Sequence, residues 1–275
     1  MLEVIEKSAE AIANAKYVIA FTGAGVSQES GIPTFRDKGG LWERFPVDEF
    51  GTPDGLVSSF SRNPKLISEF VDGIIETIQK AKPNEGHIAV AELENMGFIK
   101  SVVTQNIDNL HQDAGSKNVI EVHGNITRMR CTSCDGRYKL TKEEFIGYAK
   151  KFSEEIKSGA SLAQIINSLP KCECGGLLRP DVVLFTEPVQ NLQSAFSEAE
   201  RSDIVITAGT SGVVYPAAHI PYIAKRNAAK IIEINPTGQF FEADIYIKEK
   251  FAKALPEILK IIRKLKKDAG SLSAP

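Results

Sequence analysis

The chain has 275 residues and a formal net charge of −2, which argues against the strongly basic surface of a DNA-coating protein. Hydrophobic residues make up 43% of the sequence and charged residues 25%, the ordinary balance of a globular domain with an ample core. Residues 1–7 lack a basic segment followed by an apolar one, and no apolar run approaches the ~20 residues that cross a bilayer. We therefore expect a cytoplasmic protein that contacts neither membrane nor nucleic acid directly.

Short apolar runs alternate with helical patterns along most of the chain. Apolar residues at helical spacing predict a first helix over 3–15. Continuous apolar runs predict buried strands at 17–21, 99–103, 119–122, 203–208 and 230–234. Helical patterns lie between most of these runs, for example at 84–96 and 216–227. This alternation indicates an α/β fold with a doubly wound, parallel, Rossmann-like sheet.

A glycine turn, Gly23-Ala24-Gly25, follows the first expected strand. It begins like the fingerprint of a dinucleotide-binding loop, but Gln28 stands where the third glycine is expected. Backbone amides of such a turn can bind a pyrophosphate at the start of a helix. The alternative is an ordinary corner between a strand and a helix.

Polar residues also follow the other expected strands, at 104–108, His123, 209–211 and Asn235. Ligands of doubly wound sheets bind beyond the carboxyl ends of the strands. The sequence therefore predicts a binding crevice along one edge of the sheet.

Two segments interrupt the alternation. Residues 34–75 hold a stretch with glycine and proline and the start of a helix over 64–80, and residues 128–180 hold a charged helical stretch near 142–168 and all four cysteines. The cysteines form two close pairs, Cys131 with Cys134 and Cys172 with Cys174. Paired thiols in a reducing compartment predict one structural Zn²⁺ with four thiolate ligands, and a disulfide is the alternative.

The expected domain organisation follows from these segments. The large sheet domain is discontinuous, and the small domain consists of a helical insertion and a zinc-binding module. The boundaries are 1–34, 76–127 and 181–267 for the large domain, 35–75 for a cofactor-binding loop and the helical part of the small domain, 128–180 for the zinc-binding module, and 268–275 for a tail expected to be disordered.

The motifs, taken in order, resemble those of the sirtuin family, the NAD-dependent protein lysine deacylases. The likeness extends over roughly residues 15–255. It rests on the glycine turn, the polar loop 27–36, the run Gln105-Asn106-Ile107-Asp108, the pair His123-Gly124 and the two cysteine pairs.

The resemblance implies that NAD is the cofactor. Phe35 would cover the reacting ribose, Arg36 would pair with a phosphate, and Asp108 would accept a bond from the carboxamide of nicotinamide. The full set of implied cofactor-binding residues is Gly23, Ala24, Gly25, Gln28, Phe35, Arg36, Gln105, Ile107, Asp108, Gly209, Thr210, Ser211, Asn235, Lys250 and Phe251.

The resemblance also implies a catalytic pair. His123 would act as general base on a ribose hydroxyl, and its ordinary pKa of about 6.5 suits that role near neutral pH. Asn106 would hold an ordered water and touch the ribose. The acyl group of an acetyl-lysine protein or peptide would pass to ADP-ribose as nicotinamide is released. The remaining histidines, His87, His111 and His219, are expected to be structural.

The expected substrate peptide would add as a strand between two segments. The groove residues are Val183, Phe185, Gly212 and Val213. Three departures from the family pattern concern Thr186, where the family usually has glycine, Tyr215, where many members have glutamine, and the tight spacing of the second cysteine pair. Members that prefer acidic acyl groups carry a tyrosine and an arginine three residues apart, and this chain has apolar Val71 and Ile74 in that region. We therefore expect poor removal of succinyl, with acetyl as the default and a longer apolar acyl group left open.

Three other functions remain as alternatives. Protein mono-ADP-ribosyl transfer would use the same cleavage of NAD with a different acceptor. A nicotinamide-dependent dehydrogenase would require a hydride acceptor and a third glycine, neither of which is evident. A non-enzymatic binding module held by zinc would bind its ligands without turnover.

Overall fold

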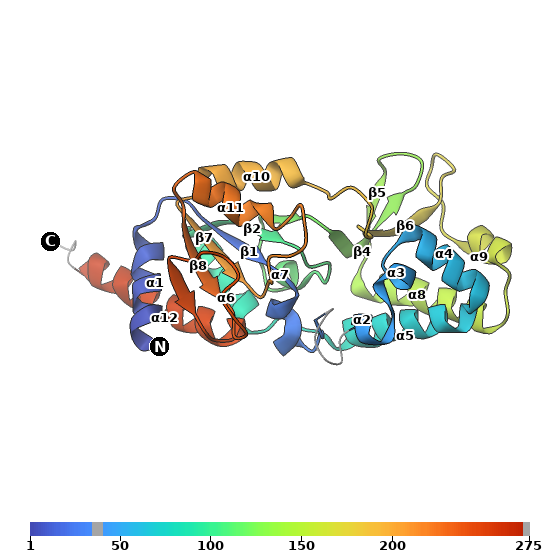
Figure 1. The fold of residues 1–275 in the computed structure, drawn as a ribbon, viewed down its shortest axis with the longest axis horizontal. Helices are drawn as coiled ribbons and strands as arrows, with labels where there is room; N and C mark the ends of the chain where they lie inside the picture. Colours follow the sequence, from blue (N-terminus) through green and yellow to red (C-terminus); the bar gives the residue numbers. More distant parts are fainter. Residues whose placement is uncertain (35–40, 272–275) are drawn as a thin grey trace.

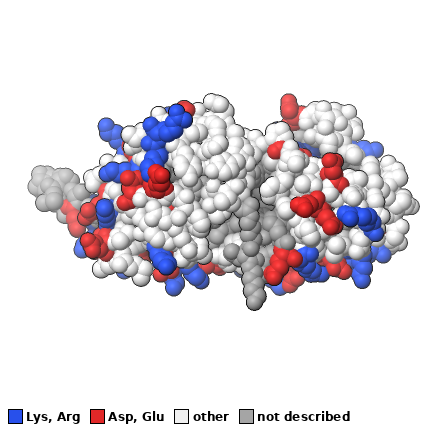
Figure 2. Space-filling view, viewed as in Figure 1, with Lys and Arg blue, Asp and Glu red and all other residues white. Residues whose placement is uncertain are grey.

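The computed structural model describes residues 1–34 and 41–271 and has two lobes (Figure 1). The large lobe contains the main sheet, the N-terminus and the last described helix, which ends at residue 271. The small lobe is built from residues 41–80 and 124–182. No helix in the described ranges has the length and apolarity needed to span a bilayer. Basic and acidic side chains are intermixed on the face shown in Figure 2.

The main sheet has six parallel strands in the order β3-β2-β1-β7-β8-β9. Its strands are β1 (Val18–Thr22), β2 (Ile99–Thr104), β3 (Val119–Glu121), β7 (Ile204–Ala208), β8 (Lys230–Ile234) and β9 (Ile245–Ile247). All five residues of β1 are buried because helices cover both faces of the sheet. The predicted doubly wound sheet is confirmed, and β9 is a short edge strand that the sequence did not predict.

Helices cover the two faces of the sheet in separate groups (Figure 1). One face carries α1 (Leu2–Asn14), α6 (Glu85–Asn95) and α12 (Phe251–Ser271), and the other carries α10 (Leu192–Arg201) and α11 (His219–Arg226). The short helix α7 (Leu110–Asp113) follows β2. Each face has its own apolar core, which includes Ile12, Leu93 and Leu255 on the first side and Phe21 and Ile220 on the second.

The helical part of the small lobe brings together two segments that are distant in sequence. Helix α5 (Pro64–Lys80) packs against α8 (Lys142–Lys157), and smaller helices complete the bundle: α2 (Leu41–Arg44), α3 (Val47–Phe50), α4 (Pro53–Arg62) and α9 (Leu162–Ser168). The single helical stretch expected near 142–168 is in fact two helices. Gly159 has φ +83°, which ends the first, and Ser161 caps the second through a capping box.

A three-stranded antiparallel sheet joins the two lobes, with strand order β5-β4-β6. Its strands are β4 (Gly124–Cys131), β5 (Arg137–Lys139) and β6 (Leu178–Val182). Strand β4 begins directly after His123, so it leads from the edge of the main sheet into the small lobe. The histidine therefore lies at the junction of the lobes.

Candidate functional site

A cavity of about 1300 Å³ lies at the carboxyl ends of the main strands and extends into the small lobe. The glycine turn, the loop after β2, His123, and the loops after β7 and β8 all border it. The structure thus brings together the polar groups that the sequence places after five strands. The expected residues on its wall are Gly23, Ala24, Gly25, Gln28, Gln105, Asn106, Ile107, Asp108, His123, Val183, Phe185, Gly209, Thr210, Ser211, Asn235, Lys250 and Phe251.

Two glycine loops pack against each other at the base of the cavity. The Gly25 amide donates to the Gly209 carbonyl at 2.8 Å, and Gly209 has φ +58°. A Cβ on Gly25 would lie 2.8 Å from the Cα of Gly209, which is closer than backbone atoms permit. After the turn the chain forms a 3-10 helix (Ala24–Ser30) rather than an α-helix. The turn is tight and leads into the start of a helix, so a pyrophosphate could come close to the backbone there.

The loop after β2 is held by its own polar side chains. Gln105 Nε2 donates to Thr210 Oγ1 at 3.0 Å. The Asn106 side chain is buried, and its Nδ2 lies 3.1 Å from the Gly23 carbonyl and 3.2 Å from Ser27 Oγ. Both amides therefore tie this loop to the glycine loops.

Asp108 belongs to the same loop and links it to Ser27 and to the start of α7. Its carboxylate accepts hydrogen bonds from Ser27 Oγ at 2.7 Å and from the Leu110 amide at 3.0 Å. Burial raises the pKa of Asp108, and these hydrogen bonds oppose the rise. Since Leu110 begins α7, Asp108 both borders the cavity and binds the first backbone amide of this helix. Ser27 is not among the residues that the sequence assigns to the site. Its position just after the glycine turn is the signal that could have indicated it.

His123 presents one ring nitrogen to the protein, and the other has no hydrogen-bond partner within residues 1–34 and 41–271. Its Nδ1 lies 3.0 Å from the carbonyl oxygen of Gln105. Because a carbonyl can only accept, the proton of the neutral ring belongs on Nδ1, and Nε2 keeps a lone pair. Burial lowers the pKa of His123, which the bond to Gln105 partly offsets. The ring is therefore neutral near pH 7 and can accept a proton.

The loops after β7 and β8 form the far end of the cavity. Asn235 Nδ2 donates to the Thr210 carbonyl at 3.1 Å, and both residues are buried. Lys250 Nζ lies 4.0 Å from Glu29. The Phe251 ring is buried against α6, with its centroid 5.5 Å from that of His87. The ring of Phe251 therefore serves mainly as core, although the residue borders the cavity.

Of the four residues expected in the peptide groove, Val183 and Phe185 line the cavity, whereas Gly212 and Val213 do not. The Val183 amide donates to the His123 carbonyl at 2.9 Å, and the Phe185 amide donates to the Gly51 carbonyl at 2.8 Å. Phe185 and Val213 are exposed, and the Gly212 amide bonds to Thr210 Oγ1. Thr186 has φ +75°, a left-handed conformation that glycine adopts more easily.

The part of the cavity inside the small lobe is mainly apolar, although Thr77, Lys151, Glu155 and Ser168 also border it. Side chains from α4, α5, α8 and α9 line it, among them Leu56, Phe60, Val71, Ile74, Phe145, Phe152 and Ile165. Neither the sequence nor its motifs predicted an apolar chamber of this kind. Phe35 and Arg36 lie outside the described ranges.

The four cysteines converge in the small sheet. Their sulfur atoms all lie within 4.8 Å of one another, and the pairs Cys131–Cys174 and Cys134–Cys172 are each 3.6 Å apart. A tetrahedral site with Zn–S bonds of about 2.3 Å needs sulfur–sulfur distances of about 3.8 Å. The separations also exceed the ~2.05 Å of a disulfide bond. The four thiols therefore fit a closed structural zinc site, and the tight spacing of Cys172 and Cys174 is compatible with it.

Comparisons with known proteins agree with one another. A sequence profile of the Sir2 family matches residues 23–216. An NAD-dependent protein deacylase of Pyrococcus furiosus is 49% identical over 261 residues, which cover 93% of this chain and 97% of that protein. A solved Sir2 homologue in complex with ADP-ribose is 40% identical, with a TM-score of 0.78 over 98% of this chain and 99% of that one. The structure of Sir2Af2 bound to a myristoylated histone peptide is 35% identical, with a TM-score of 0.69 over 98% of this chain and 100% of that one.

Proposed function

Since the chain belongs to the Sir2 family, we propose that it is an NAD-dependent protein lysine deacetylase. It would transfer the acetyl group of a modified lysine to ADP-ribose and release nicotinamide. The observation that carries this proposal is the neutral His123 ring, whose Nδ1 is fixed by a backbone carbonyl while Nε2 has no hydrogen-bond partner among the described residues.

The residues at the base of the cavity fit NAD. Gly23, Ala24 and Gly25 would border the phosphates, with the Ala24 amide as the donor of this turn, because the Gly23 and Gly25 amides already donate to the carbonyls of Ala208 and Gly209. A side chain on either glycine would meet the Gly209 loop. Asn235 and Thr210 would hold the adenosine part. When bound, NAD supplies the glycosidic bond to nicotinamide, whose cleavage exposes a ribose carbon to the acyl oxygen.

The polar loop after β2 would surround the nicotinamide end. The Asn106 amide, fixed by Gly23 and Ser27, would hold a water and contact the ribose. Asp108 would accept from the nicotinamide carboxamide, and Gln105 and Ile107 would complete the wall. Phe35 would cover the ribose and Arg36 would pair with a phosphate. These two roles rest on the sequence alone.

His123 would remove a proton from a ribose hydroxyl through Nε2. The Gln105 carbonyl holds the tautomer that leaves this nitrogen basic, so the ring needs no reorientation. The peptide would lie against Val183 and Phe185 on one side and Gly212 and Val213 on the other, which brings its modified lysine to the mouth of the cavity.

The test uses an acetyl-lysine peptide with and without NAD, followed by mass spectrometry. We expect deacetylated peptide, nicotinamide and acetyl-ADP-ribose only when NAD is present. His123→Ala should lose about 10²–10⁴-fold in turnover. The matched control, His219→Ala, changes an exposed histidine and should keep full activity. A protein that instead becomes ADP-ribosylated would establish the transferase alternative.

A longer apolar acyl group is a second candidate substrate. The apolar chamber between α4, α5, α8 and α9 opens from the same cavity as His123 and would take a hydrocarbon chain. Val71 and Ile74 offer no partner to a carboxylate, so we expect succinyl to be removed more slowly than acetyl. Matched peptides carrying acetyl, myristoyl or succinyl groups test this. Succinyl removal faster than acetyl removal would contradict it.

A further inference from the structure

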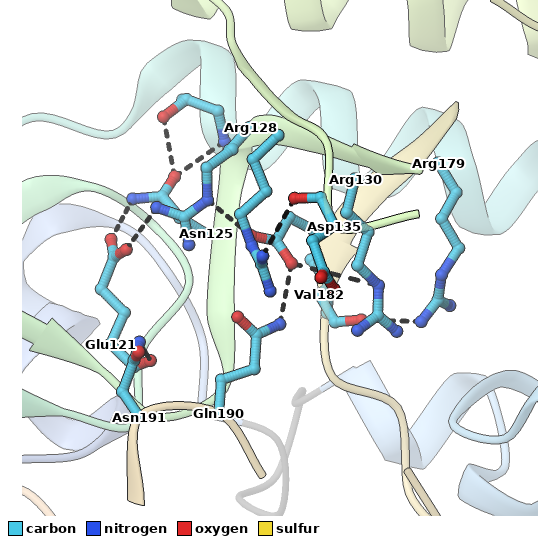
Figure 3. Close-up of polar contacts among 12 residues, drawn as sticks. Glu121, Asn125, Arg128, Arg130, Asp135, Arg179, Val182, Gln190 and Asn191 are labelled. Carbon is cyan, nitrogen blue, oxygen red and sulfur yellow. Dashed lines mark hydrogen bonds and ion pairs between the residues drawn. The ribbon is translucent and has the colours of Figure 1, made fainter. Parts of the chain in front are cut away.

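We propose that Asp181 and Arg128 are positioning residues for His123, because with Glu121 they form a buried ionic network that holds the backbone on both sides of this histidine (Figure 3). The inference rests on the proposed role of His123 as the base.

The His123 segment crosses from the main sheet to the small sheet and is tied to both. Just before the histidine, the Val122 amide donates to the Thr104 carbonyl at 3.0 Å. The Gln190 amide donates to the Val122 carbonyl at 2.9 Å, and the Val183 amide donates to His123 itself at 2.9 Å. The position of the ring therefore depends on the chain that leaves β6 as well as on β2.

Asp181 fixes the β6 side of this junction. Its side chain is fully buried, its Oδ2 accepts from Arg128 Nε at 2.5 Å, and its Oδ1 accepts from Gln190 Nε2 at 2.7 Å. Its backbone carbonyl lies against Gly124, where a Cβ would come within 1.9 Å, and Gly124 has φ +82°. The residue that follows His123 thus rests directly on Asp181.

Glu121 fixes the β3 side. One carboxylate oxygen accepts from Arg128 NH1 at 2.8 Å, and the other accepts from Gln112 at 2.7 Å and from Asn125. Glu121 and Asn125 lie two residues before and two residues after His123, and Figure 3 shows Glu121 facing Asn125 and Arg128. Side-chain hydrogen bonds therefore connect the backbone before His123 with the backbone after it.

Arg128 links the two carboxylates across the turn. Its Nε and NH1 bond to different acids, which requires the planar fork of a guanidinium and could not be reproduced by a lysine. Arg137 and Arg130 lie farther from Asp181, at 3.4 and 4.0 Å. Loss of either partner removes the short hydrogen bond between Arg128 and Asp181 that joins β4 to β6, so the strands should shift rather than keep their spacing. A displacement of about 1 Å at a catalytic group can cost 10²-fold in rate.

The experiment separates the step that uses His123 from the step that does not. In the proposed reaction, nicotinamide release removes no proton from the ribose, whereas completion of acetyl transfer does. Exchange of labelled nicotinamide into NAD, measured with acetylated peptide, reports the first step, and peptide deacetylation reports the whole reaction. The variants are Asp181→Asn and Arg128→Lys. Asp72→Asn is the control, because Asp72 is an ion-paired carboxylate that does not line the cavity.

We expect Asp181→Asn and Arg128→Lys to lower deacetylation about 10–100-fold while nicotinamide exchange stays within about threefold of wild type. Asp72→Asn should leave both rates unchanged. Equal losses in both reactions, or undiminished deacetylation by a folded variant, would overturn the positioning role, as would unfolding of both variants. Failure of the proposed function is a different result, because wild-type protein would then show no deacetylation.

Discussion

Lowering the pH from 7 to 5 should destabilise the large lobe through two buried histidines, His87 and His111. Their side chains are 0% and 1% exposed and their ring centroids are 4.8 Å apart. His111 Nε2 lies 3.0 Å from Thr22 Oγ1, and His87 Nδ1 receives the Asn84 amide at the start of α6. The other ring nitrogen of each has no hydrogen-bond partner among the described residues.

The size of the effect follows from the shift at His87. Burial lowers the pKa of His87 from 6.5 to about 4. Burial, and then the neighbouring His87, also hold the pKa of His111 well below 6.5. Folding favours the neutral rings, so their contribution is fully present above pH 6.5 and is lost as the pH falls toward 4. For His87 alone the full loss is about 3 kcal/mol, of which about 2 kcal/mol falls between pH 7 and 5.

Urea unfolding followed by circular dichroism at pH 7 and pH 5 measures this loss. His87→Gln is the informative variant, because glutamine at this third helical position can keep the capping box with Asn84 and does not titrate. Its pH-dependent loss should be smaller than that of wild type by about 2 kcal/mol. His219→Gln changes an exposed histidine and should keep the wild-type dependence. Equal unfolding free energies of wild type at both pH values, or an unchanged dependence in His87→Gln, would refute the reasoning.

Three further perturbations test other parts of the structure. Thr186→Gly should raise the free energy of unfolding by about 1 kcal/mol, because glycine relieves the left-handed conformation; a denaturation midpoint at or below wild type would contradict this. Gly25→Ala should weaken NAD binding at least about tenfold in calorimetry, since its Cβ would meet the Gly209 backbone; Gly147→Ala, where a Cβ meets nothing within 4 Å, is the control. Cys172→Ser should lose bound zinc in metal analysis and several kcal/mol of stability, and an undiminished zinc content would argue against the four-thiol site.

The central strands could be predicted from sequence because each is buried on both faces. A strand such as β1 therefore appears as a run of apolar residues that ends in Thr22, and β7 appears as an apolar run interrupted only by Thr207. The sequence did not predict β9 or the small sheet, because their strands are short or only partly buried. Strand β5, for example, has three residues and none of them is fully buried. Their pairing depends on partners far along the chain, which local patterns do not reveal.

The position of the site could be predicted because parallel strands end at a common edge. That rule places the glycine turn, Asn106 and His123 together before any motif is considered. The ionic network around Asp181 could not be predicted, since β3, β4 and β6 supply its charges and Arg128 meets Asp181 only through the antiparallel pairing of β4 with β6. The apolar chamber likewise arises from the packing of α5 against α8, two helices separated by more than sixty residues.

The insertion of the small lobe between β1 and β7 sets the order in which a chain emerging from the ribosome can complete its two cores. Every element of the small lobe lies before residue 183, so its bundle and cysteine cluster can close as soon as that stretch has been made. Strand β1 is made early, yet one of its two neighbours, β7, begins only at residue 204. We therefore expect the nascent enzyme to hold a finished small lobe beside a half-built sheet, whose open edge is the part most in need of a chaperone.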